Sequence, residues 1–252
     1  MTAHHVVDGP ADGPVLVLVG SLGSTVEMWR PQLPALAGRF RVVRVDLRGH
    51  GGSPARPGGY RVADLADDVR ALLDDLGAGR VDWCGLSLGA MVGMSLAAEH
   101  PDRIGRLVLC CTSSHFPDPT VWHDRITAVS AGGTASIARA VVDRWFTPGW
   151  AAAHPDTVAE ARAMVAGTSD EGYIGCCAAL GAWDHRDRLA AITAPTLVVA
   201  GADDAATPVD PHARTLAAGI SDARLAIVPG GHLATIESAD EVNRLLLAHL
   251  TA

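Results

Sequence analysis

A serine stands between two glycines at residues 85–89, in the stretch GLSLG. The hydroxyl of Ser87 is a weak nucleophile unless a base takes its proton, and that base needs a third group to hold its tautomer. An apolar run precedes Ser87 and helix-forming residues follow it, so we expect the serine at a turn from strand to helix. Glycine at both flanking positions avoids clashes there, and the hydroxyl is presented above the edge of a sheet.

A candidate acid and a candidate base follow further along the chain. Asp203 and Asp204 come just after an apolar run that ends at Gly201, and His232 comes just after a Pro-Gly-Gly turn. We therefore predict Ser87 as nucleophile, Asp204 as the orienting acid and His232 as the base. The alternative acid is Asp203, which we expect instead to be a solvated turn residue.

Acyl transfer also needs two N–H donors directed at the oxygen that becomes negatively charged. We predict the backbone amide of Leu88, which follows the nucleophile, and that of Leu22, in the loop after the first long strand. A glycine-rich stretch at 46–54 lacks the spacing and the lysine of a phosphate-binding loop. We interpret it as a structural turn that braces the loop of Leu22.

Composition excludes several classes of function. The 252 residues carry a formal net charge of -8 and no basic run, so we expect no nucleic-acid partner. The sequence contains no lysine, which excludes Schiff-base chemistry at that side chain. The five cysteines lack the spacing of a metal site or a disulfide framework, and we expect no metal and no cofactor. Without a leader-like start or a membrane-length apolar run, we expect a cytoplasmic protein with no membrane partner; the oligomeric state is left open.

Short apolar runs alternate with helical patterns along most of the chain. Their near-continuous apolarity is typical of strands that are buried on both faces of a sheet. The alternation predicts an α/β fold with a mostly parallel, doubly wound sheet. The runs cover 15–19, 41–46, 81–85, 106–111, 196–201 and 224–230.

The alternation stops between residues 115 and 194, where only helical patterns occur. They cover 121–131, 136–146, 157–165 and 173–183. Because a long structureless loop is uncommon in a compact domain, we predict an all-helical lid at 115–194, inserted in a core formed by 1–114 and 195–252. The insertion follows the strand after the serine helix, so we expect the lid over the carboxyl edge of the sheet.

Several stretches make the chain resemble the 3-oxoadipate enol-lactonases, α/β-hydrolases of the β-ketoadipate pathway of aromatic degradation. The serine turn and the Ser, Asp, His order are common to the superfamily, whereas LVLCCTSS at 107–114, RWFTPGW at 144–150 and EGYIGCCAAL at 171–180 are more specific. The resemblance covers nearly the whole chain, although many relatives carry His-Gly where this sequence has Gly20-Ser21. It implies the α/β-hydrolase fold, cofactor-free opening of the enol-lactone through an acyl-enzyme, and a free-standing hydrolase.

The implied substrate is a small lactone with a carboxylate, and a net-negative protein needs a local cation to hold it. Among the six arginines of the lid we favour Arg144, beside Trp145, with Arg139 and Arg162 as the next choices. Trp145 and Trp122 are the preferred apolar contacts to the substrate. Two further tryptophans are candidates for the pocket wall, Trp29 and Trp183.

Two other functions remain possible on the same residues. One is another cofactor-free carboxylesterase or perhydrolase, because the lid decides the substrate. The other is a binding module that keeps an unused triad, against which the presence of all three triad residues argues. A haloalkane dehalogenase or epoxide hydrolase is disfavoured, since its nucleophile is an aspartate and this turn carries Ser87.

The first prediction concerns the nucleophile. Ser87→Ala should remove nearly all turnover of an ester or lactone while leaving folding intact, because only the attacking oxygen is lost. Steady-state assays and circular dichroism check the two parts. Retention of more than a few per cent of the activity would contradict the assignment.

Overall fold

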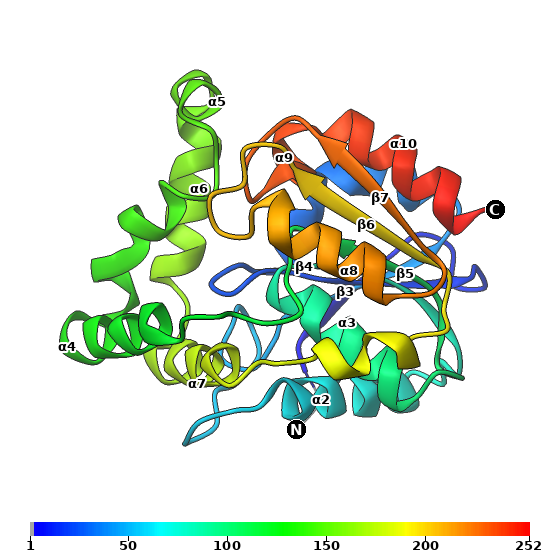
Figure 1. Cartoon of the computed structure of the whole chain (residues 1–252), viewed down its shortest axis with the longest axis horizontal. Helices are drawn as coiled ribbons and strands as arrows, with labels where there is room; N and C mark the ends of the chain where they lie inside the picture. The colour runs from blue at the N-terminus through cyan, green and yellow to red at the C-terminus, as the bar shows by residue number, and fades with distance from the viewer. Residues whose placement is uncertain (1–2) are drawn as a thin grey trace.

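The computed structural model describes residues 3–252, and its centre is a seven-stranded sheet in the order β1-β3-β2-β4-β5-β6-β7 (Figure 1). All neighbouring strands are parallel except β1, which runs antiparallel to β3. The mostly parallel sheet is therefore confirmed, with one strand more than the apolar runs predict. The strands are β1 His5–Asp8, β2 Val15–Val19, β3 Arg41–Val45, β4 Val81–Leu86, β5 Ile104–Cys110, β6 Thr196–Gly201 and β7 Ala223–Val228.

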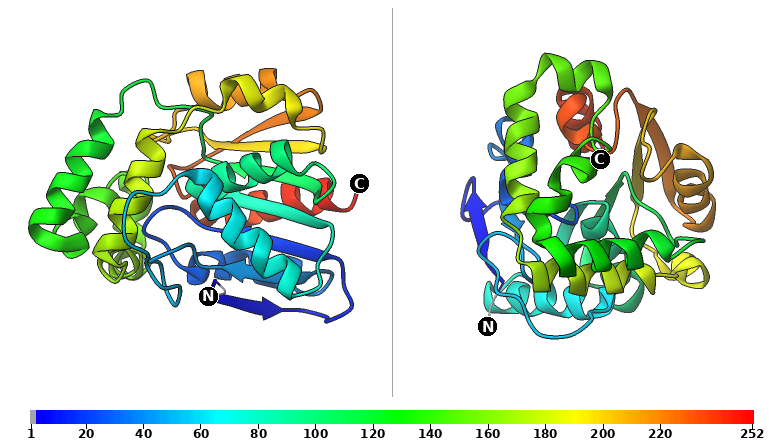
Figure 2. Two further views of the ribbon diagram at one scale, coloured as in Figure 1. Left: turned by 90° about the horizontal axis from the view of Figure 1, so that it is seen from below. Right: turned by 90° about the vertical axis from the view of Figure 1, so that its left-hand side faces the viewer.

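Helices cover both faces of the sheet (Figure 2). On one face α2 packs on α3, and η2 packs against both α3 and α8. On the other face α10 contacts η1, α1 and β5. α3 is buried along almost its whole length, which explains why its sequence shows no polar face. The core helices are η1 Val26–Gln32, α1 Leu33–Leu36, α2 Val62–Asp75, α3 Leu88–Glu99, η2 Arg186–Ala191, η3 Val209–Ala213, α8 Arg214–Gly219, α9 Ala234–Glu237 and α10 Ala239–Leu250.

Four helices form a separate layer beyond the carboxyl ends of the strands (Figures 1 and 2). They are α4 Thr120–Val142, α5 Pro148–Ala153, α6 Pro155–Ala166 and α7 Asp170–Gly181. α4 packs against both α6 and α7. It spans the gap between the predicted helices 121–131 and 136–146, with a kink at Gly133, where φ is 71°. After α7 the chain returns to the core, since η2 packs on α3 and α8.

The turn between β4 and α3 is packed too closely for side chains at its two glycines. A Cβ on Gly89 would lie 2.1 Å from the carbonyl oxygen of Val19, and one on Gly85 would lie 2.3 Å from that of Gly89. The amide of Gly89 also donates to the carbonyl oxygen of Gly20, 3.0 Å away. The loop after β2 and the turn after β4 are thus in direct backbone contact.

This contact generates a prediction about stability. Gly89→Ala should lower the free energy of unfolding by about 1–3 kcal/mol, because the new methyl group displaces backbone rather than a flexible side chain. Gly79→Ala is the matched control, since a Cβ there meets nothing within 4 Å. Urea denaturation of both variants tests the difference, and equal stability of the two would contradict it.

Candidate active site

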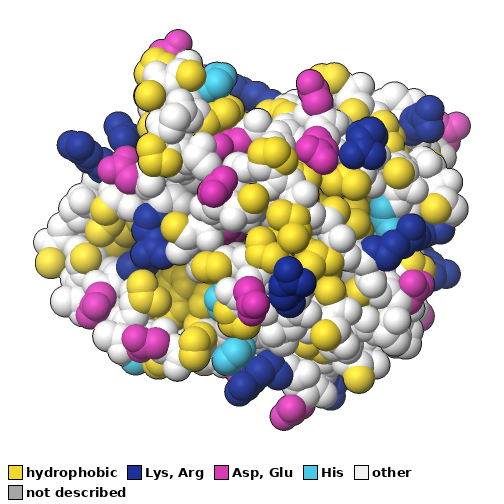
Figure 3. Space-filling view, turned by 45° about the horizontal axis from the view of Figure 1, so that its top comes forward, with side chains coloured by type: hydrophobic (Ala, Val, Ile, Leu, Met, Phe, Trp, Pro, Cys, Tyr) yellow, Lys and Arg dark blue, Asp and Glu magenta, His cyan; other side chains and the backbone are white. Residues whose placement is uncertain are grey.

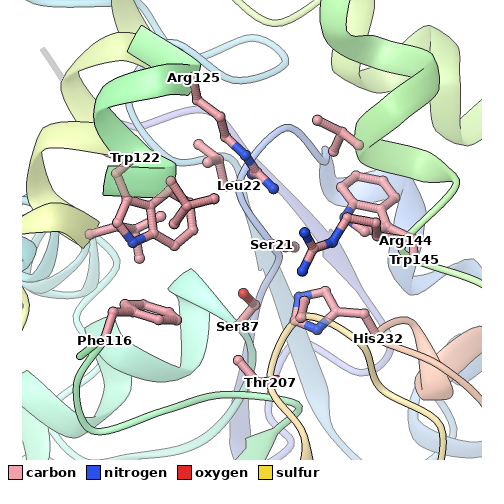
Figure 4. A pocket seen from close by; sticks show the side chains of 14 residues that line it. Ser21, Leu22, Ser87, Phe116, Trp122, Arg125, Arg144, Trp145, Thr207 and His232 are labelled. Carbon is pink, nitrogen blue, oxygen red and sulfur yellow. The ribbon is translucent and has the colours of Figure 1, made fainter. Parts of the chain in front are cut away.

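Ser87 lies at the turn between β4 and α3 with φ 54° and ψ -113°, a left-handed backbone that non-glycine residues rarely adopt. Its amide donates to the carbonyl oxygen of Cys110 at 2.9 Å, and its own carbonyl accepts from Ala90 at 3.0 Å. The hydroxyl of Thr112 donates to the same carbonyl at 2.9 Å. These bonds hold the strained turn, and the side chain opens into a cavity (Figure 4).

His232 and Asp204 meet at the same edge of the sheet, in the loops after β7 and β6. Nδ1 of His232 lies 2.9 Å from Oδ2 of Asp204, and the two side chains are 4% and 0% exposed. Because an ionised carboxylate only accepts hydrogen bonds, Nδ1 carries a proton, and whenever the ring is neutral Nε2 is the acceptor. Such an imidazole has the tautomer that a general base requires.

The carboxylate of Asp204 is fixed by further donors. Oδ1 accepts from the amides of Ala206 and Thr207 at 2.7 and 3.0 Å, and the Thr207 hydroxyl donates to Oδ2 at 2.7 Å. Asp203, by contrast, is exposed. The structure therefore brings Asp204 to the histidine and leaves Asp203 in solvent, as the sequence pattern predicts.

Burial alone would raise the pKa of Asp204, but the charge of His232 and its hydrogen bond, together with the bonds from Thr207, lower this pKa well below its ordinary value. The carboxylate thus stays ionised through the neutral and mildly acidic range. Because the folded-state pKa is the lower one, the stability that this group contributes is present above its unfolded-state pKa. That stability is lost only as the pH falls through the lowered value.

Ser87 and His232 line one cavity of about 80 Å³ beneath the lid (Figure 4). Within residues 3–252 no hydrogen bond joins the serine hydroxyl to the imidazole. Catalytic hydrogen bonds are often long without substrate and tighten in the complex. The arrangement therefore places a candidate nucleophile and a candidate base on the wall of one cavity.

The loop of Leu22 forms the neighbouring wall. Leu22 lines the cavity, while the side chain of Leu88 is fully buried and its amide begins α3. The next residue in the loop, Gly23, donates its amide to Nε2 of His50 at 2.9 Å. Nδ1 of His50 pairs with the carbonyl oxygen of Arg48 at 2.9 Å, and burial lowers the pKa of His50, which keeps the ring neutral. The stretch 46–54 thus contacts and braces this loop.

Two lid arginines point into the cavity, Arg125 from α4 and Arg144 from the segment after it (Figure 4). Within residues 3–252 neither is paired with an acidic side chain. The other four lid arginines are paired: Arg139 and Arg162 with Asp143, Arg186 with Asp184, and Arg188 with Glu99. Arg139 and Arg162, the next choices from sequence, do not line the cavity.

The two unpaired guanidinium groups are held by neutral partners. Nη2 of Arg144 donates to the carbonyl oxygen of Ala205 at 2.9 Å. Arg125 lies over the ring of Trp122, 5.0 Å from its centroid, and Nη1 donates to the Tyr173 hydroxyl at 3.3 Å. Burial raises the pKa of Tyr173 to about 12, so this hydroxyl remains neutral. Both positive charges are thus left for a ligand.

Two of the four tryptophans considered from sequence line the apolar wall of the cavity. Trp122 and Trp145 line the cavity, as predicted, and Phe116 lies edge-on to Trp122 with 5.0 Å between ring centroids. Trp29 and Trp183 do not line it: Trp29 is fully buried in the core, and Trp183 donates to the carbonyl oxygen of Ser113. Arg125 is not among the arginines favoured from sequence to hold the substrate carboxylate. Its i,i+3 spacing from Trp122 does place the two residues on one face of a helix.

Neither a membrane-spanning helix nor a metal-binding cluster is found among the described residues. Within residues 3–252 no helix is both long and apolar enough to cross a membrane, and no cluster of three or more His, Cys, Asp or Glu is suited to a metal ion. On the face shown in Figure 3, acidic and basic side chains are interspersed. Arg125 and Arg144 differ from these surface charges in lining the cavity of Ser87.

Comparisons with known proteins identify relatives over almost the whole chain. Residues 14–239 match the family model described as alpha/beta hydrolase fold. The 3-oxoadipate enol-lactonase 2 of Acinetobacter baylyi is 34% identical, over 97% of this chain and 91% of the relative. A protein of Variovorax paradoxus named "Putative carbamate hydrolase RutD" is 37% identical, over 99% of this chain and 96% of its own. The crystal structure of the enol-lactonase from Burkholderia xenovorans LB400 superposes with a TM-score of 0.96 at 38% identity, covering 99% of this chain and 96% of that one.

The two aspartates give a paired prediction. Asp204→Asn should lower kcat/KM by several orders of magnitude, about 10⁴-fold in a comparable triad, because the imidazole loses the anion that fixes its tautomer. Asp203→Asn changes an exposed side chain and should leave kcat/KM within about twofold. Parallel assays of the two variants check this, and the reverse ranking would make Asp203 the acid.

Proposed function

The chain belongs to the α/β-hydrolase family and is a hydrolase, and we propose that it opens the enol-lactone of 3-oxoadipate to 3-oxoadipate through an acyl-enzyme. The enol-lactonase relatives from Acinetobacter baylyi and Burkholderia xenovorans support this substrate. The observation that carries the proposal is the pair of unpaired arginines, Arg125 and Arg144, in the cavity of Ser87.

The proposed reaction has two steps. The hydroxyl oxygen of Ser87 attacks the lactone carbonyl while Nε2 of His232 takes its proton, and the amides of Leu22 and Leu88 stabilise the oxyanion. The bond from the carbonyl carbon to the ring oxygen then breaks, and the leaving enolate receives the proton. Ketonisation makes this opening effectively irreversible. A water molecule, deprotonated by His232, then attacks the acyl-enzyme and releases the new carboxylic acid.

Charge is the main support for an anionic substrate. The enol-lactone carries one carboxylate, and the protein as a whole is negatively charged, so attraction must come from within the cavity. Arg144 and Arg125 supply it, each already held in place by a neutral group. A charge-assisted hydrogen bond in such a site contributes on the order of 1.5–3 kcal/mol, which is roughly a ten- to hundredfold effect on binding.

Cavity size and lining are also consistent with a small lactone. About 80 Å³ is far below the roughly 300–1,000 Å³ of pockets for drug-sized ligands, so a long acyl chain is disfavoured. The walls from Phe116, Trp122 and Trp145 are apolar and match the ring of a lactone. The arginines and the apolar walls together favour an anionic lactone over a long-chain ester.

A second candidate is hydrolysis of a carbamate, which the relative from Variovorax paradoxus favours at 37% identity. Carbamate is smaller than the lactone and has no apolar part for the aromatic walls to contact. Ammonia release from carbamate and ultraviolet detection of enol-lactone opening separate the two activities. We expect the purified protein to open the lactone with the higher kcat/KM, and the opposite ranking would overturn the proposed substrate.

The arginines provide the mutational prediction. Arg144→Ala and Arg125→Ala should each lower kcat/KM for the enol-lactone by about ten- to a hundredfold, because a charge-assisted contact to the carboxylate is lost. Hydrolysis of neutral p-nitrophenyl acetate should change by less than about threefold in the same variants.

Arg139→Ala is the matched control, since its side chain is 84% exposed and paired with Asp143 outside the cavity. It should leave both activities unaltered. Equal losses on the anionic and the neutral substrate in Arg144→Ala and Arg125→Ala would show a collapsed lid instead of a lost charge contact, and would contradict this role.

A further inference from the structure

Glu237, the last residue of α9, connects the lid to the loop of His232. Its Oε1 accepts the amide of Gly231, which directly precedes the histidine, at 2.9 Å. The same half-buried carboxylate accepts both donors of Thr147, the residue before α5: the amide at 2.9 Å and the hydroxyl at 2.7 Å. One side chain thus holds the base loop and the lid together.

A second contact holds the other side of the histidine. Leu233, which follows His232, donates its amide to the carbonyl oxygen of Trp145 at 2.9 Å. The fit is close, because a Cβ on Gly231 would lie 2.9 Å from that same carbonyl oxygen. Both neighbours of the histidine are therefore bound to lid residues 145–147, one directly and one through Glu237.

Lid residues 145–147 directly follow Arg144, the proposed contact to the substrate carboxylate. Arg144 directly precedes Trp145, and both line the cavity. A shift of this segment therefore moves the cation, the aromatic wall and the loop of His232 together. The strained backbone of Ser87 does not depend on this segment, since its hydrogen bonds go to β5, to α3 and to Thr112 just after β5.

We propose that Glu237 is a positioning residue that transmits the position of lid residues 145–147 to His232. This rests on the proposed role of His232 as general base but not on the identity of the lactone. When a substrate carboxylate holds Arg144, the segment is held as well, and the base is fixed within reach of Ser87. Recognition of the substrate and alignment of the base are thereby linked through one carboxylate.

A carboxylate suits the chemistry of the link. Three donors converge on it, from Gly231 and Thr147, and an ionised carboxylate offers two oxygens that only accept. Glutamine can keep both amide donors on its one oxygen, but its NH₂ then faces the Thr147 hydroxyl, which has to turn from donor to acceptor. Glu237→Gln should therefore retain part of the link, and Glu237→Ala none of it.

The test is steady-state kinetics on p-nitrophenyl acetate and on the enol-lactone, with unfolding measured in parallel. Glu237→Ala should lower kcat on both substrates by about 10- to 100-fold, because a displacement near 1 Å of a catalytic group has an effect of this order. KM for p-nitrophenyl acetate, which has no carboxylate for Arg144 to hold, should change by less than about twofold. Glu237→Gln should lie between the alanine variant and the unaltered protein.

Glu241→Ala is the matched control, because Glu241 lies on the next helix and pairs with Arg244. It should leave kcat unaltered. Thr147→Val keeps the shape of the side chain and removes one hydrogen bond, so it should lower kcat by about three- to tenfold. This variant also tests the proposal if Glu237→Ala fails to fold.

Several outcomes would overturn the positioning role. A lower unfolding temperature with kcat within about threefold in Glu237→Ala would make the residue merely structural. An increase in KM at constant kcat would place it in substrate binding alone. Failure of the enol-lactone as a substrate would instead overturn the proposed function, since the ester assay reports on the base in either case.

Discussion

The buried hydrogen bond between His232 and Asp204 is the interaction on which the rest of the site depends. A carboxylate with 0% exposure of its side chain is tolerated only because the imidazole and the donors around Thr207 satisfy it. The two residues come from loops after neighbouring strands, so the parallel pairing of β6 and β7 brings them together. The nucleophile reaches the same edge through β4, so the sheet brings all three groups to one edge, and contacts with lid residues 145–147 hold the loop of His232 there.

We propose that the lid selects the substrate on which this general chemistry acts. In a chain with a net charge of -8, its unpaired guanidinium groups face inward from Arg125 and Arg144, while its other arginines have acidic partners. The cavity therefore presents two cations without acidic partners, which supports the proposed anionic substrate. Glu237 lies where lid and core meet, so the same segment that presents a cation also contacts the loop of the base.

The core and the triad arrangement could be predicted because their signals are local. Ser87 directly follows β4, Asp204 and His232 lie in the loops just after β6 and β7, and glycines accompany the turns. The short strand β1 gave no such signal, since only Val6 and Val7 of its four residues are apolar. The choice among lid arginines could not be made locally either, because it depends on which helix face meets the cavity. Arg139 and Arg125 both lie on α4, on opposite sides of the kink at Gly133, and only the tertiary packing separates them.

The most direct measurement is a crystal structure of the Ser87→Ala variant with the enol-lactone bound. The account predicts the lactone carbonyl oxygen within hydrogen-bond distance of the amides of Leu22 and Leu88. It also predicts the carboxylate against the guanidinium of Arg144, of Arg125, or between the two. A lactone bound with its carboxylate toward solvent and both guanidinium groups unoccupied would contradict the account.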